Sequence, residues 1–265
     1  MVDFVYKRKY VLSDFLDIMR ILRSPEGCPW DREQTHKSVR RNFLEETYEV
    51  CEAIDSGDLD LLKEELGDVL MQVILHSLIE EEQGSFNLDD VADFACKKLI
   101  RRHPHIFSDV EVENTEQVLQ NWDEIKKQEK NQQTASETME SVAKSLPALW
   151  RAEKIQKKAR KVGFDWNKLP DALAKIDEEL TELKDAIESG TGIEEELGDL
   201  LFATVNTSRF LNIDPEMALH ASCDKFTRRF SSLEKKASEK GLVLEQMTLD
   251  EMDELYEIAK SEEEK

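Results

Sequence analysis

Apolar positions along this chain repeat mostly at the spacing of one face of an α-helix. A clear example is the i, i+4, i+7, i+8, i+11 stripe made by Val11, Phe15, Ile18, Met19 and Leu22. The run 61–78 is apolar on most faces, as expected of the central helix of a bundle. Period-two alternation, which would indicate strands, is almost absent, and 241–245 is expected to be a loop. The pattern predicts an all-α protein.

Helix-start signals and one polar stretch divide the chain. N-cap or first-turn signals stand at Asp31 with Gln34, Asn87 with Asp90, Pro170, Asp214-Pro215 and Thr248 with Glu251. Segment 126–145 is rich in Lys, Gln, Glu, Ser and Thr and poor in large apolar residues, which is typical of a linker. We therefore expect a first domain at 1–128, a linker at 129–145 and a second domain at 146–265.

The two expected domains carry the same arrangement of acidic residues. The first copy consists of Glu46, Glu49, Glu65 and Asp68, and the second of Glu179, Glu182, Glu196 and Asp199. In each copy, two acids three residues apart share a face of one helix, and the other two share a face of the next. Glu49 and Glu65 each lie eight residues from Gly57, so an antiparallel hairpin places them level. The second copy folds in the same way about Ser189.

Four carboxylates on one patch repel each other unless a cation neutralises them. Ligand sets made only of oxygen atoms suit Mg²⁺, or Mn²⁺ in its place. The alternative is that these acids are ordinary solvated helix faces, and the duplication of the complete arrangement disfavours it. The sequence therefore predicts two divalent-metal sites.

Basic and aromatic residues follow each acidic set. Lys98 and Arg102 are four residues apart, as are Lys225 and Arg229, so each pair shares a helix face. Cations beside a metal–carboxylate cluster are what a polyphosphate requires. Aromatic side chains near them could stack on a nucleobase, and they are Trp122, Tyr256 and Trp166. The alternatives are a solvated basic stripe and aromatic anchors for helix packing.

Composition narrows the function classes. A formal net charge of −22 argues against a general nucleic-acid binder, because phosphates would be repelled. The 4 cysteines show neither paired metal spacing nor a secretory framework. The 5 histidines show no pairing that would indicate a ligand set. No apolar run is long enough to cross a bilayer, and a cytoplasmic location is expected.

The duplicated motifs resemble a known family. The pattern E-E-x-x-E…E-L-G-D occurs twice, after Gly27-Cys-Pro-Trp-Asp31 in the first copy, with Lys-x-x-Arg-Arg following each acidic set and Ser145-Leu-Pro-Ala-Leu149 opening the second half. This combination is similar to the two-domain bacterial MazG family of nucleoside triphosphate pyrophosphohydrolases. The resemblance implies two tandem MazG-type helical bundles related to dimeric dUTPases. It also implies an obligate dimer, with the main activity in the C-terminal half. The run 61–78 is too apolar on all sides to stay exposed, which predicts a homodimer or higher even oligomer.

Carried over by the resemblance, residue roles fall into two groups. The metal ligands would be Glu179, Glu182, Glu196 and Asp199, with the first acidic set as their N-terminal counterpart. The substrate contacts would be Lys175, Lys225, Arg229 and Tyr256 together with Glu179 and Asp199, and Lys98, Arg102 and Trp122 in the N-terminal copy. Two positions depart from the family: Tyr256 stands where a Trp is common, and the turn Thr191-Gly192 lacks a Lys that some relatives carry.

We therefore expect Mg²⁺-dependent conversion of a nucleoside triphosphate and water to a nucleoside monophosphate and diphosphate, over a broad range of bases. Glu178 or Glu179 would orient the attacking water, and Lys225 with Arg229 would stabilise the leaving diphosphate. One alternative is a narrower dUTPase-like pyrophosphatase. The other is a regulatory helical protein that binds nucleotide or metal without turnover.

Overall fold

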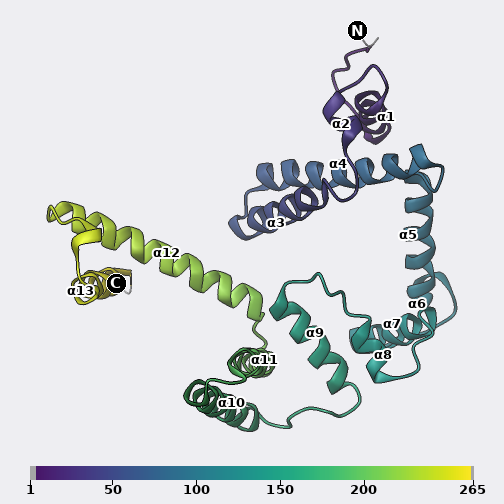
Figure 1. The fold of residues 1–265 in the computed structure, drawn as a ribbon. Coiled ribbons are helices and arrows are strands. Elements are labelled where there is room, and N and C mark those ends of the chain that lie inside the picture. Colours follow the sequence, from purple (N-terminus) through teal and green to yellow (C-terminus); the bar gives the residue numbers. More distant parts are fainter. Residues whose placement is uncertain (1–3, 264–265) are drawn as a thin grey trace. The chain divides into compact units, whose positions relative to one another are not determined.

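Every regular element in residues 4–263, the part of the chain that the computed structural model describes, is a helix (Figure 1). This confirms the all-α fold class that the apolar spacing predicts. The chain divides into two units with their own internal contacts, Met1–Lys126 and Lys127–Lys265, and each is described by itself. Within the described range, no helix combines the length and apolar character that crossing a membrane requires.

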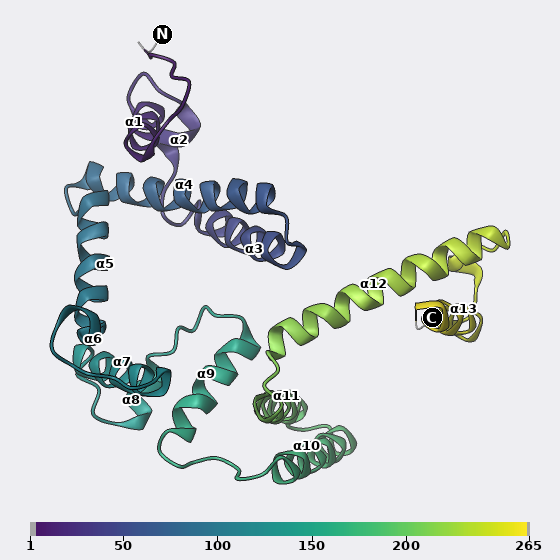
Figure 2. The same cartoon turned by 180° about the vertical axis from the view of Figure 1, so that it is seen from behind.

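The first unit is built on a long antiparallel helical hairpin. Its helices are α1 (Leu12–Arg23), α2 (Pro29–Glu33), α3 (Arg40–Ser56), α4 (Leu59–Gln83), α5 (Leu88–Arg102), α6 (Pro104–Phe107) and most of α7 (Thr115–Glu129). Helix α3 ends at Gly57, whose φ of 71° lies in the left-handed region that glycine adopts without strain. Asp58 then starts α4 by accepting the backbone N–H groups of Asp60 and Leu61. The turn brings α3 and α4 to pack along one another (Figures 1 and 2).

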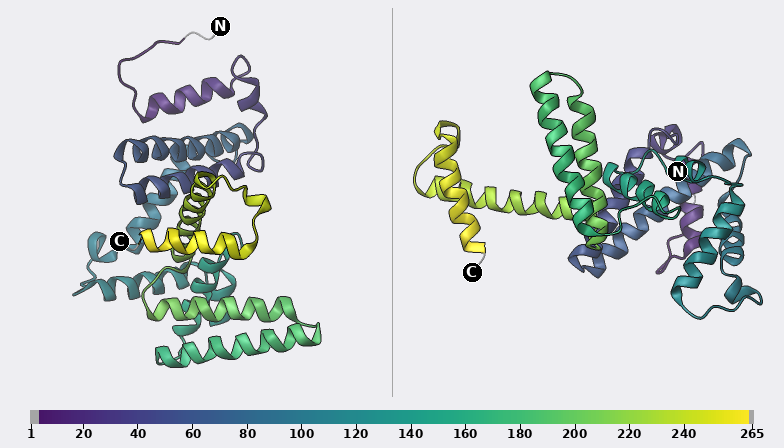
Figure 3. Two further views of the ribbon diagram at one scale, coloured as in Figure 1. Left: turned by 90° about the vertical axis from the view of Figure 1, so that its left-hand side faces the viewer. Right: turned by 90° about the horizontal axis from the view of Figure 1, so that it is seen from below.

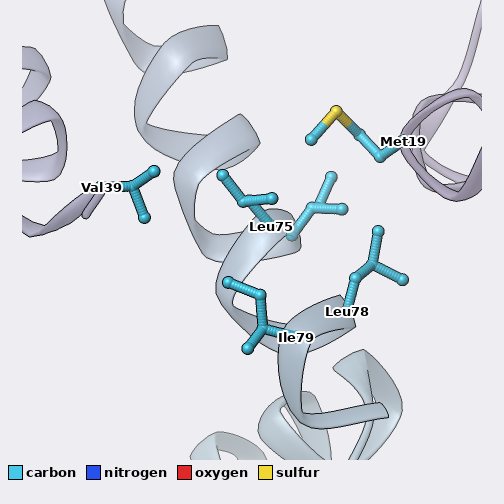
Figure 4. Close-up of a cluster of buried hydrophobic side chains, with 6 residues drawn as sticks. Met19, Val39, Leu75, Leu78 and Ile79 are labelled. Atoms are coloured by element: carbon cyan, nitrogen blue, oxygen red, sulfur yellow. The ribbon is translucent and has the colours of Figure 1, made fainter. Parts of the chain in front are cut away.

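The core of the first unit joins α1 and the segment before α3 to α4 (Figure 4). Its buried members are Met19, Val39, Ile74, Leu75, Leu78 and Ile79. Burying one such side chain completely contributes roughly 1.5–3 kcal/mol. This small cluster therefore holds the C-terminal half of α4 firmly, while the hairpin end near Gly57 depends on the α3–α4 contact.

The second unit contains a matching hairpin. Its helices are α8 (Ala135–Glu140), α9 (Ala148–Arg160), α10 (Leu169–Ser189), α11 (Ile193–Phe210), α12 (Pro215–Glu239), the 3₁₀ helix η1 (Leu244–Gln246) and α13 (Leu249–Glu263). Helix α10 ends at Gly190, which has a φ of 72°, so the α10–α11 turn uses the same glycine cap as the first hairpin. Figure 3 shows α10 and α11 side by side and antiparallel. Gln156 of α9 joins this hairpin by donating a hydrogen bond of 2.7 Å to the carbonyl oxygen of Phe202.

Helices α12 and α13 form a second pair in this unit (Figures 1 and 3). Leu233 and Ala237 of α12 pack with Leu255 of α13 in a buried cluster. The connection between them, expected to be a loop at 241–245, contains the short helix η1 at its end. This pair carries its own small core, separate from the contacts of the α10–α11 hairpin.

Most predicted helix starts are confirmed, and one is wrong. Asn87, Asp214 and Thr248 all accept backbone N–H groups at helix starts, and Pro170 lies in the first turn of α10. Asp31 with Gln34 does not open a helix. Pro29 at N1 starts α2 earlier, so Asp31 lies inside α2, and α3 begins only at Arg40.

Candidate active sites in two acidic clusters

The first hairpin brings its acidic residues together as the spacing predicts. Oxygen atoms of Glu46 and Glu49 on α3 and of Glu65 on α4 all lie within 4.8 Å of one another. Asp68 is close enough to act electrostatically on both Glu46 and Glu65. Only 9% of the Glu65 surface is exposed. The four acids are therefore one cluster on the facing sides of two helices.

Burial and mutual repulsion disfavour the ionised form of this cluster. Burial is the largest cause that raises the pKa of Glu46, followed by the charges of Asp68 and Glu49. Burial also raises the pKa of Glu65, followed by the charges of Glu49 and Asp68. A divalent cation among these oxygen atoms would remove the repulsion, and the donor set is the one that Mg²⁺ and Mn²⁺ take.

The second hairpin repeats the cluster. Oxygen atoms of Glu179 on α10 and of Glu196 and Asp199 on α11 lie within 4.8 Å of one another. Glu179 is the most buried of them, with 5% of its surface exposed. Burial raises the pKa of Glu182, and the charges of Glu179 and Glu196 act in the same direction. Both sequence copies thus converge on a possible cation site within their own hairpin.

A lysine distinguishes the second cluster from the first. The ammonium of Lys175 lies 2.7 Å from an oxygen of Glu178 and 2.7 Å from an oxygen of Glu179. Hydrogen bonds to Glu178 and then to Glu179 raise the pKa of Lys175, so this side chain stays charged. The matching position in the first copy is Asn42, which carries no charge. The C-terminal cluster therefore carries a cation of its own, which the first cluster lacks at the matching position.

The predicted phosphate contacts Lys225 and Arg229 lie on α12, not on the hairpin that carries the acids. The Nε atom of Arg229 lies 2.8 Å from Oε2 of Glu263 on α13. Bonding to Glu263 is the largest cause that raises the pKa of Arg229, and Tyr256 adds a hydrogen bond. The Tyr256 ring lies 5.9 Å from that of Phe226 on α12. Among residues 4–263 of one chain, the contacts of Arg229 therefore join α12 to α13, and they do not bring it to the second acidic cluster.

The N-terminal counterparts form a local group of their own. The guanidinium of Arg102 lies 5.7 Å from the centre of the Trp122 ring, and the His103 ring meets the same indole edge-on at 4.8 Å. Lys98 lies on the same helix, 5.9 Å above the Phe94 ring. Trp122 thus takes part in packing between α5 and α7, which was the alternative to nucleobase stacking.

Two polar clusters in the structure were not predicted from the sequence. The carboxylate of Asp165 lies 2.6 Å from Arg209, and both side chains are largely buried. The other cluster joins His36, His76 and Glu80 in the first unit. The two histidines are 40 residues apart, so no local spacing could reveal them. Only the register of Glu80 four residues after His76 was visible in the sequence.

The ranges that carry the two acidic clusters match a known protein family. The family model described as the MazG nucleotide pyrophosphohydrolase domain matches residues 34–107 and 170–233. The chain belongs to the MazG family. The two matched ranges contain both acidic clusters, and they also contain Lys98, Arg102, Lys225 and Arg229. Trp122 and Tyr256 lie outside them.

Curated relatives extend the similarity to most of the chain. It is 47% identical over 250 residues to the nucleoside triphosphate pyrophosphohydrolase/pyrophosphatase MazG of Thermotoga maritima, covering 94% of this chain and 96% of that protein. It is 43% identical over 257 residues to the nucleoside triphosphate pyrophosphohydrolase of Escherichia coli K12, covering 95% and 98%. It is also 48% identical to the uncharacterized protein YabN of Bacillus subtilis, of which it covers 52%.

The raised pKa values predict that stabilisation by a bound metal depends on pH. Without metal, folding raises the pKa of Glu46, Glu65 and Glu182 above the usual 4.5. The folded chain therefore binds more protons than the unfolded chain, and the free energy of unfolding rises as the pH falls toward 4.5. Bound Mn²⁺ requires the ionised forms and stabilises the fold. We expect Mn²⁺ to raise the thermal unfolding midpoint more at about pH 7.5 than at about pH 5.

The measurement is calorimetry with and without MnCl₂ at both pH values. The variant carrying Glu46→Gln and Glu179→Gln serves as the control and should lose most of the shift. A metal-induced shift of equal size at both pH values, or one retained in the variant, would contradict metal binding at these clusters.

Proposed function

We propose that the chain is a Mg²⁺-dependent nucleoside triphosphate pyrophosphohydrolase of broad ribo- and deoxyribonucleotide range that acts in cleaning or regulating the nucleotide pool. The proposal rests on the cluster of Glu179, Glu196 and Asp199, whose oxygen atoms lie within 4.8 Å of one another, with Lys175 beside it. Carboxylates and an ammonium in one place suit a metal-bound polyphosphate. The names of the relatives and the family match support the same reaction.

Each residue of the second cluster has a definite role in this proposal. Glu179, Glu182, Glu196 and Asp199 would hold the cation, which would supply positive charge against the phosphate oxygens. Glu178 lies at the edge of the cluster, where it shares Lys175 with Glu179. Glu178 orients a water molecule and accepts its proton as the oxygen attacks the α-phosphorus. The bond from this phosphorus to the bridging oxygen breaks, and diphosphate leaves with that oxygen.

Cations stabilise the leaving diphosphate. Lys175 is already at the cluster and can exchange Glu178 for a phosphate oxygen. Lys225 and Arg229 lie on α12, and we propose that a second copy of the chain brings them to the cluster. Their charge would then offset the negative charge that develops on the leaving group.

Exposed apolar residues support a dimer. Leu173, Leu180 and Ile187 recur every seven residues along α10, and all three are exposed. Leu66 and Leu70 on α4 are exposed, as are their counterparts Leu197 and Leu201 on α11. Apolar faces of this extent mark association surfaces. We propose that the hairpins cover these faces in a homodimer or a higher even oligomer.

Helical glycines support the same assembly. Gly67 and Gly198 occupy matching positions next to Asp68 and Asp199. A Cβ at either position would meet no atom within 4 Å among the described residues. Glycine inside a helix costs about 1 kcal/mol relative to alanine, and this chain by itself does not require it. The close approach of a partner helix or a phosphate would require it.

The first functional prediction concerns the products. We expect nucleoside monophosphate and diphosphate, because in the proposed mechanism water attacks the α-phosphorus. Nucleotide products are separated by chromatography, and phosphate release is measured with and without inorganic pyrophosphatase over a panel of ribo- and deoxyribonucleoside triphosphates. Release of nucleoside diphosphate and orthophosphate would overturn the reaction, activity in excess EDTA would overturn the metal requirement, and turnover of dUTP alone would favour the narrower pyrophosphatase.

The second prediction concerns assembly. The apolar faces and the separated cations predict a dimer or higher even oligomer in solution. Light scattering coupled to size-exclusion chromatography measures the mass at micromolar concentration. A stable species of 30.7 kDa would show that the chain is a monomer and refute the shared site.

The third prediction separates the two clusters. Glu179→Gln with Glu182→Gln keeps side-chain shape and deletes two ligand charges, and we expect turnover to fall by roughly 100-fold or more. The matched pair Glu46→Gln with Glu49→Gln should have the smaller effect, because the first cluster lacks a counterpart of Lys175. Steady-state kinetics measures both, with circular dichroism as the folding control. If only the N-terminal pair abolishes turnover, the principal site lies in the other half.

A further inference from the structure

The two histidines of the first unit form a contact that neither acidic cluster uses. His36 lies in the segment between α2 and α3, and His76 lies on α4. Their Nδ1 atoms are 2.6 Å apart, and Nε2 of His36 lies 2.6 Å from Oε1 of Glu80. The three side chains form a continuous chain of hydrogen bonds from α4 to the segment before α3 and back to α4.

The ring geometry shows what lies between the two nitrogen atoms. The ring planes are parallel to within 6°, and the ring centres are 4.9 Å apart. That distance equals the separation of the Nδ1 atoms plus the two radii from ring centre to nitrogen. The rings are therefore coplanar, edge to edge, and each Nδ1 points along the line to the other. This is the geometry of a straight N–H···N hydrogen bond.

The same geometry excludes two other occupants. A zinc ion needs about 2.0–2.1 Å to each nitrogen, and the 2.6 Å gap is too short to hold it on that line. A proton on each Nδ1 would place two N–H groups head to head. The gap therefore holds a single proton, donated by one imidazole and accepted by the other.

We propose that His36, His76 and Glu80 form a pH-sensitive clasp that closes while one proton lies between the rings and opens when a second proton binds. The clasp ties the start of α3 to α4. Val39, three residues after His36, is 2% exposed and belongs to the core that Figure 4 shows together with Ile79 of α4. Opening the clasp would release this segment from α4 and loosen the first turn of α3.

The surroundings of the clasp favour the closed state, in which one proton lies between the two rings. Burial is the main cause that lowers the pKa of His76, and the charge of His36 acts in the same direction. The hydrogen bond from His36 is the main cause that lowers the pKa of Glu80, and Ser85 adds to it. Glu80 is thus a carboxylate that holds His36. The ring centres of His76 and of Phe43 on α3 are 5.5 Å apart.

Other charges near the clasp are engaged with different partners. The ion pairs on the packed elements are Arg20 with Glu81 and Arg23 with Glu82 between α1 and α4, and Arg41 with Glu45 on α3. On α5, the Asp90 carboxylate accepts the N–H of Asn87. Lys37 and Arg40 flank His36 in its own segment.

The sign of the pH dependence follows from the pKa of His76. Its folded-state pKa lies below the usual 6.5, so the unfolded or opened segment binds the extra proton first. Closure is complete above 6.5 and weakens as the pH falls below it. Because the opened segment binds one extra proton, the equilibrium constant for closing falls by up to about tenfold per pH unit.

Two measurements on the full chain test the clasp. Long-range ¹H–¹⁵N spectra of the histidine rings should show one proton shared by the two Nδ1 atoms at about pH 7.5, lost on acidification to about pH 5.5. Hydrogen exchange should report the N–H of Val39, bonded to Thr35, and of Phe43, bonded to Val39. After correction for intrinsic rates, their exchange should rise by up to about tenfold per pH unit below 6.5.

Matched variants separate the clasp from other titrating groups. His76→Asn keeps a polar atom near the position of Nδ1 but does not titrate there, so the rise in exchange should disappear. His220→Asn makes the same change at an exposed position on α12, and the rise should remain. Both variants keep Glu46 and Glu65, so the acidic cluster is the same in each. Independent protons on both rings at neutral pH, unchanged exchange in the wild-type chain, or a rise that persists in His76→Asn would each overturn the proposal.

Discussion

Repulsion among carboxylates held on two facing helices is the constraint on which the rest of each half depends. The glycine turn fixes how α3 and α4 pair, and the same turn fixes α10 and α11. Once the pairing is set, the acids cannot separate without breaking helix contacts. The raised pKa values of Glu46, Glu65 and Glu182 record this cost. A bound cation lowers the electrostatic free energy of the cluster, because every carboxylate attracts it.

The two halves relieve the same constraint differently. Lys175 neutralises part of the second cluster from within its own helix, whereas Asn42 leaves the first cluster without such a charge. A lysine beside the acids lowers the cost of the metal-free state, and in the proposed function it would also contact a phosphate of the substrate. Both copies therefore bring their acids together, while lysine at position 175 in place of asparagine at position 42 alters the electrostatics of one.

The α12–α13 pair illustrates how a site can be divided. Arg229 is held by Glu263, which keeps the guanidinium oriented and charged until a stronger anion competes for it. The apolar residues left exposed on the hairpins are the part of the structure that one chain does not bury. Both features are consistent with a chain whose chemistry and hydrophobic core are completed together by association, as we propose.

The sequence by itself determined the elements that depend on near neighbours. Helix spacing, glycine turns and acids three residues apart act within a few turns, so the all-α fold, the duplication and the convergence of both clusters were all predictable. The tertiary structure alone decided contacts between distant segments. The bond from His36 to His76 and the pairing of Arg229 with Glu263 depend on how helices pack. Packing selects among many partners that local spacing leaves equivalent, and this is why these contacts became visible only in the folded chain.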